Sequence, residues 1–115
     1  MTVLALAQGA YYFVTGLWSL VHIDSFQKVT GRKTDLWLVK TVGLLLVALG
    51  SGLILAGLRQ EFGAGLIFIA MASCAGLITI ELTYVSKRVI APIYLADAAV
   101  EAGFISWWAG CLLNV

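Results

Sequence analysis

Two carboxylates, Asp97 and Glu101, lie inside the last apolar stretch of the sequence, residues 92–114. A helix advances about 100° per residue, so side chains four positions apart project from one face, about one turn apart. Tyr94 and Trp108 extend the same face, whereas the opposite face is apolar or small. A carboxylate near the middle of a membrane costs about 2.5–3.5 kcal/mol on insertion scales. We therefore expect this pair to face other helices, where it can meet a cation, a proton or water.

Other apolar stretches carry ionisable residues at a similar predicted depth. Lys40 lies near the start of the second stretch, Glu81 near the end of the third and His22 at the end of the first. At about 1.5 Å per residue, Lys40, Glu81 and Asp97 fall within roughly 6–8 Å of the same membrane boundary, and Glu101 lies about one turn deeper. The sequence therefore predicts one ligand- or proton-binding site, formed by Lys40, Glu81, Asp97, Glu101, His22 and Tyr94.

This cluster has two interpretations. In the structural one, Lys40 pairs with one or more carboxylates and holds the helices together, or reaches towards the headgroups. In the functional one, a single lysine cannot neutralise three carboxylates, so at least one acid needs a proton, water or a metal ion. Glu101 is the deepest acid and the least able to reach the headgroups, and we expect it to carry the proton.

Motifs of other chemistries are missing from the sequence. It contains no HxxxH, CxxC or ExxH spacing, so the sequence identifies no metal ligands and no cofactor, although the carboxylates with His22 would suit a divalent ion. It also lacks a serine-centred elbow, a paired Cys–His arrangement and a phosphate-binding glycine loop. We expect a protein that is not an enzyme, with an intramembrane enzyme acting on lipid as a third alternative.

The composition is that of a membrane protein. The chain has 115 residues, of which 62% are hydrophobic and 11% charged, so we expect a single transmembrane domain over 1–115. The net charge of +1 gives no reason to expect nucleic acid as a partner. Cys74 and Cys111 lie in different apolar stretches and do not suggest a disulfide.

Four apolar stretches are each close to the ~20 residues that span ~30 Å of hydrocarbon. The short links between them make consecutive helices antiparallel neighbours. The predicted fold is therefore all-α, an integral membrane four-helix up-and-down transmembrane bundle. Its predicted helices are approximately 3–23, 36–57, 63–85 and 92–114.

The distribution of Lys and Arg predicts the orientation, because these residues favour cytoplasmic loops. Five of them lie in residues 24–35 and 86–91, and Arg59 alone lies in the remaining link. We predict a multi-pass protein with loops 24–35 and 86–91 in the cytoplasm and both termini outside. The N-terminus has no basic residue ahead of its apolar stretch, so we expect the first helix to be retained.

Small and polar residues at helical spacing predict how the helices pack. Small residues four apart, such as Ala48 with Gly52 and Ala72 with Gly76, let helices approach closely and could also form a homo-oligomer. The first helix carries a polar stripe, whose side chains either form hydrogen bonds to other helices or line a hydrated cavity. Tryptophans near the predicted interfaces suggest an aromatic belt. The residues of the stripe are Gln8, Tyr11 or Tyr12, Thr15, Ser19 and His22, and the tryptophans are Trp18, Trp37, Trp107 and Trp108.

The link 24–35 is predicted to form a short interfacial turn that ends at Gly31, with Asp35 as the N-cap of the second helix. The stretch from Phe26 to Gly43, FQKVTGRKTDLWLVKTVG, resembles a pattern of uncharacterised small bacterial four-helix integral membrane proteins. This resemblance implies a location in the bacterial inner membrane and no particular activity.

These observations together favour a small integral membrane protein that binds or transports a small cationic or polar solute, or protons, through an ionisable bundle interior. The alternative is a non-catalytic structural or accessory membrane subunit whose polar groups specify helix packing. In both cases the lipid bilayer is the expected partner.

Overall fold

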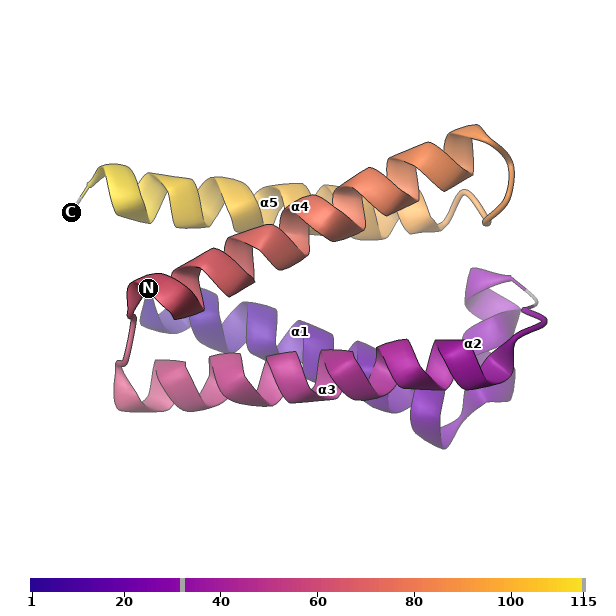
Figure 1. The fold of residues 1–115 in the computed structure, drawn as a ribbon, viewed down its shortest axis with the longest axis horizontal. Coiled ribbons are helices and arrows are strands. Elements are labelled where there is room, and N and C mark those ends of the chain that lie inside the picture. Colours follow the sequence, from indigo (N-terminus) through magenta and orange to yellow (C-terminus); the bar gives the residue numbers. More distant parts are fainter. Residues whose placement is uncertain (32, 115) are drawn as a thin grey trace. The chain divides into compact units, whose positions relative to one another are not determined.

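The computed structural model describes residues 1–31 and 33–114 and is all-α in these residues, as predicted. They form five helices in chain order (Figure 1): α1 (Thr2–Val21), α2 (Ile23–Thr30), α3 (Leu36–Arg59), α4 (Ala64–Ser86) and α5 (Tyr94–Leu113). The four long helices begin and end within two residues of the predicted apolar stretches. Arg32, one of the residues from which the orientation was predicted, lies outside the described residues.

Three of the long helices, α1, α3 and α4, are long and apolar enough to cross a membrane. This finding supports the prediction of a membrane protein. The fourth long helix, α5, carries Asp97 and Glu101 and is not among these three candidates. A bundle of four membrane-spanning helices therefore remains a prediction.

Helix α2 occupies most of the link that the sequence predicts as a short turn. The backbone at His22 is not helical, and its side chain accepts a hydrogen bond from the N–H of Ser25, which caps the start of α2. The helix ends at Gly31, as predicted, where φ is 100°, a value that side chains disfavour. Asp35 directly precedes α3, but its side chain makes no capping hydrogen bond.

Residues Thr2–Glu61 form one compact unit, in which α1 packs along α3 (Figure 1). The helices meet at four glycines, which we call the glycine seam: Gly9 and Gly16 on α1, and Gly43 and Gly50 on α3. A Cβ atom on Gly9 would lie 2.7 Å from the carbonyl oxygen of Gly50, and one on Gly50 would lie 2.5 Å from that of Gly9. Gly16 faces Gly43 in the same way. Each seam helix thus places a glycine every seven residues, two turns apart, and runs antiparallel to the other.

The inner side of α1 also carries much of the predicted polar stripe. Gln8, Tyr12 and Ser19 are buried, and the Ser19 hydroxyl donates a hydrogen bond to the carbonyl oxygen of Gly16 at 2.8 Å. Thr15 is half-buried and donates to the carbonyl oxygen of Tyr11 at 2.7 Å. Hydroxyls that bond back to their own helix need no donor or acceptor from a neighbour. Hydrogen bonding within the helix therefore accounts for part of this stripe.

Residues 62–114, with Met1, form the second compact unit, in which α4 packs against α5. The buried residues of α4 are Ala70, Cys74 and Glu81, and those of α5 are Ala98, Glu101 and Trp108. Trp108 is 0% exposed, which agrees with its predicted place on the face of Asp97 and Glu101 and removes it from the tryptophans that could act as interfacial anchors. It lies two turns beyond Glu101 on the same face, and burying that face takes the indole inside. Trp37 and Trp107 are exposed, as anchors would be.

The small residues that the sequence singles out at four-residue spacing are mostly outside these contacts. Ala48 and Gly52 are exposed on α3, and Ala72 and Gly76 are exposed on α4. A Cβ atom on Gly52 or Gly76 would meet nothing within 4 Å. The close approach of α1 to α3 therefore uses the glycines of the seam and leaves these other small residues on the surface.

We predict that Gly50→Ala destabilises the protein, although alanine ordinarily favours a helix over glycine by about 1 kcal/mol. The added methyl would strike the backbone of Gly9 and Phe13, which cannot move as a flexible side chain would. We expect a loss of about 1–3 kcal/mol, typical of overpacking, in reversible unfolding in mixed micelles. Gly52→Ala, on the same helix and in open space, is the matched control and should be neutral or stabilising. Equal effects of the two substitutions on stability would contradict the close approach of α1 and α3 at Gly50.

Candidate functional site

Three carboxyl side chains gather between α4 and α5 near the connection that joins them. Glu81 lies on α4 five residues before its end, Asp97 lies in the first turn of α5, and Glu101 lies one turn further along α5. The carboxyl groups of Glu81 and Asp97 are hydrogen-bonded to each other, and Glu101 is close enough for its charge to act on Glu81. We call these three residues the acid cluster.

Burial differs within the acid cluster. Glu81 is 4% exposed and Glu101 is 1% exposed, whereas Asp97 is half-buried. Neither α4 nor α5 contains a lysine, arginine or histidine. Asp97 is near the N-terminus of α5, where the backbone N–H groups stabilise a negative charge. Asp97 is therefore the member of the cluster with the most access to solvent, and the two glutamates are the most removed from it.

The hydrogen bond between Glu81 and Asp97 sets the protonation of the pair. An ionised carboxylate only accepts hydrogen bonds, so two carboxyl groups can be bonded directly only if one of them carries a proton. The second oxygen of Glu81, Oε1, is buried and accepts no hydrogen bond from any residue that the structure describes. A buried oxygen in this state costs about 1–3 kcal/mol. The arrangement can hold a proton, and it offers a buried oxygen to a further donor or cation.

Of the other predicted site residues, two belong to the unit Thr2–Glu61 and one is on α5. Lys40 is exposed on α3 and belongs to the unit Thr2–Glu61, so its predicted approach to the carboxylates remains a prediction. His22 is exposed and caps α2 in the same unit. Tyr94 is half-buried as the first residue of α5, on the helix that carries two of the acids. The structure thus brings together Glu81, Asp97 and Glu101.

A second polar group, around Ser25, was not foreseen from the sequence. The indole Nε1 of Trp18 donates to Ser25 Oγ at 2.7 Å, and His22 Nδ1 lies 2.8 Å from the same oxygen. The ring of Phe26 packs edge-on against Trp18, with ring centroids 5.3 Å apart. The spacing of His22 and Ser25, three residues apart, is the signal that could have revealed this cap. These contacts join the end of α1 to α2 and have a structural role.

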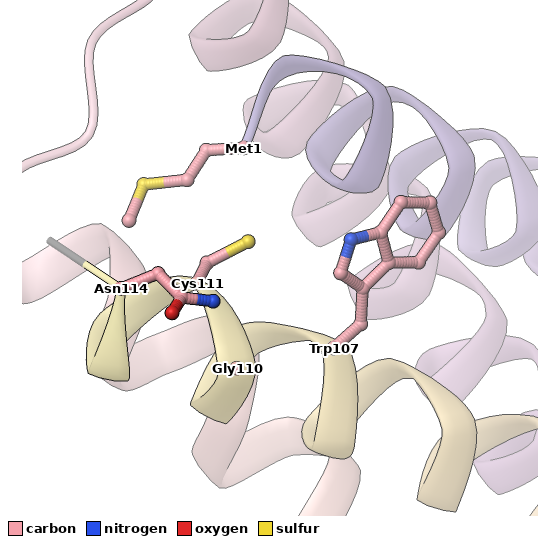
Figure 2. Close-up of a pocket in the computed structure, with 5 residues that line it drawn as sticks. All are labelled: Met1, Trp107, Gly110, Cys111 and Asn114. Atoms are coloured by element: carbon pink, nitrogen blue, oxygen red, sulfur yellow. The ribbon is translucent and has the colours of Figure 1, made fainter.

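A shallow pocket lies at the other end of α5 from Asp97. Figure 2 shows Trp107, Gly110, Cys111 and Asn114 following one another along one face of the helix, with Met1 beside them. The lining is mainly apolar, and Cys111 is half-buried. This pocket contains none of the predicted site residues.

The described residues contain no group of three or more His, Cys, Asp or Glu side chains arranged to hold a metal ion. The chain matches no family model, no curated protein and no solved structure. The resemblance of residues 26–43 to small bacterial membrane proteins therefore remains a prediction.

We predict that the melting temperature of the protein falls as the pH rises through the range in which the Glu81–Asp97 pair loses its proton. The hydrogen bond contributes stability while the pair holds the proton, and above that range two negative charges lie side by side. A bond to a charged group contributes about 1.5–3 kcal/mol. In Glu81→Gln, the amide donates to Asp97 at every pH, so the melting temperature should depend less on pH.

The matched control is Glu61→Gln, because Glu61 is exposed and pairs with Arg59 at 2.7 Å outside the acid cluster. Thermal unfolding in detergent across a pH series measures all three proteins. Parallel pH profiles for the wild type and Glu81→Gln would show that the pair shares no proton.

Proposed function

We propose that this is an integral membrane protein whose α4–α5 unit binds a proton or small cation at the acid cluster and moves it, or a solute coupled to it, through the membrane. The observation that carries the proposal is the acid cluster itself. Two of its carboxyl groups are buried, one pair is hydrogen-bonded, and both helices lack basic residues. Ionisable residues inside a membrane are costly and occur mainly at ion and proton pathways.

Exposed hydroxyl groups support a membrane environment. Thr41, Ser51 and Thr79 lie on outer faces of α3 and α4, and each donates to the carbonyl oxygen four residues earlier, at 2.7–2.8 Å. Hydrocarbon offers no hydrogen-bond partner, so a lipid-facing hydroxyl must satisfy its donor within its own helix. These faces are otherwise apolar, with exposed side chains such as Leu44, Leu45, Leu55, Phe68, Ile69 and Ile80.

Helix α5 is the fourth membrane span in this proposal. Its 20 residues extend about 30 Å, the thickness of the hydrocarbon core. It packs against α4, which is itself a candidate span. Its most polar deep residue, Glu101, is buried, while its exposed large side chains include Leu95, Val100, Trp107 and Leu112. One of the two acidic residues of α5 is thus buried and does not face the surface of the helix pair.

The alternative function is that of an accessory membrane subunit. It is favoured by the exposed small residues of α3, α4 and α5, where a Cβ atom on Gly52, Gly76 or Gly103 would meet nothing within 4 Å. In lipid, such surfaces allow close packing of a further helix from another subunit. This alternative predicts a stable complex and no solute movement by the isolated protein.

A flux assay separates the two functions. The purified protein in liposomes should conduct protons, sodium or potassium down an imposed gradient, and Glu81→Gln should reduce that flux at least tenfold. Glu61→Gln, on the exposed link after α3, should leave the flux unchanged. Liposomes that show no more flux than empty ones for all three ions would contradict transport and favour the accessory subunit.

The proposed topology places both termini outside and the loops 24–35 and 86–91 in the cytoplasm. Five basic residues in those loops, against Arg59 alone at the opposite end of α3, motivate it. In a variant without Cys74 and Cys111, we expect Gln60→Cys to react with an impermeant maleimide in intact cells. Lys33→Cys should react only after permeabilisation. The reverse pattern of labelling would show that the orientation is inverted.

A further inference from the structure

We infer that the ligand of the acid cluster is a single proton, shared between Glu81 and Asp97 and exchanged with water through Asp97. This inference rests on the proposed function and specifies its ligand. It starts from the direct hydrogen bond between the two carboxyl groups, which cannot form when both are ionised. A metal ion or monovalent cation held between them would need both groups as carboxylates and would replace that bond.

The surroundings of the pair favour one proton over a bound cation. The charged groups that act on Glu81 from α5 are Asp97 and Glu101, both acidic, and α4 itself carries no other charged residue. Like charges this close in a site of low polarity share protons, because full ionisation would place several negative charges together. The described residues also offer no group suited to a metal ion.

The buried oxygen of Glu81 is a separate observation that points to a ligand. Glu81 is 4% exposed, and its Oε1 accepts no hydrogen bond from any residue in the described part of the chain. A carboxylate with one unsatisfied buried oxygen is far more costly than a neutral carboxylic acid in the same place. The pair therefore keeps its proton on the Glu81 side, and the Asp97 carboxylate accepts the hydrogen bond.

Because Asp97 and Glu81 differ in burial, protons from water reach the pair through Asp97. Asp97 is half-buried in the first turn of α5, whereas Glu81 is enclosed. In loading, a proton from hydronium adds to a carboxylate oxygen of Asp97, and a proton passes along the hydrogen bond to Glu81. The charge of the pair then changes from −2 to −1. In release, the proton passes back from Glu81 to Asp97, the O–H bond of Asp97 breaks, and a water molecule takes up the proton, with no oxidation or reduction.

Infrared difference spectroscopy of the protein in nanodiscs of zwitterionic lipid tests this inference. Between acid and alkaline pH, the wild type should lose the carbonyl band of one protonated carboxyl group per chain. Glu81→Gln should lack this band, and Glu61→Gln should retain it. Labelling glutamate with ¹³C at the side-chain carboxyl should shift the band in the unsubstituted protein. Glu101→Gln with the same label should still show the shifted band, which assigns the band to Glu81 even if Glu81→Gln does not fold, because the remaining labelled glutamate, Glu61, is exposed.

A wild type without the band, or a band that Glu81→Gln retains, overturns the inference. A liposome flux of sodium or potassium that depends on Glu81 would then leave the proposed function standing, with a cation as the ligand. Absence of both the band and any flux that depends on Glu81 would remove the proposed function as well.

Discussion

A carboxyl group that is withdrawn from water must be neutralised, hydrogen-bonded or paired with an opposite charge. Helices α4 and α5 bury Glu81 and Glu101 without a basic residue on either helix, so the acids of this unit depend on each other. The hydrogen bond between Glu81 and Asp97 is one such interaction between acids. The inward face of α5, from Ala98 through Glu101 to Trp108, follows from this requirement, because turning Glu101 inwards turns its helical neighbours inwards with it.

The unit formed by α1 and α3 is held together differently. Its four seam glycines bring one backbone against the other, so the attraction comes from many short contacts between main-chain atoms. Buried polar residues are present here too, but Ser19 and Thr15 satisfy their hydroxyls within α1. One unit therefore relies on close backbone packing, and the other buries polar side chains between its helices. In the second arrangement the buried polar side chains include two carboxyl groups, which a proton or cation could bind.

The positions of the long helices could be predicted because apolar runs of about 20 residues leave few other possibilities. The shared face of Asp97 and Glu101 followed from helical periodicity alone. The same periodicity puts Trp108 on this face, in agreement with its burial, but periodicity does not say which neighbour covers a face, so the exposure of Lys40 could not be derived. The sequence predicts a short turn where the structure has helix α2. The eight residues of α2 lack an apolar run, and the start of the helix depends on a histidine cap. Small residues at a spacing of four do not reveal the seam, because its glycines repeat every seven residues.

Each compact unit joins helices that are close in the sequence, α1 with α3 and α4 with α5. This bears on the order in which the protein is made. Chains emerge from the ribosome N-terminus first, and contacts between nearby segments need little loop closure. The seam can therefore form while α4 and α5 are still being synthesised. The acid cluster has to wait for α5, so its three carboxyl groups come together only after the segments of the seam have been synthesised.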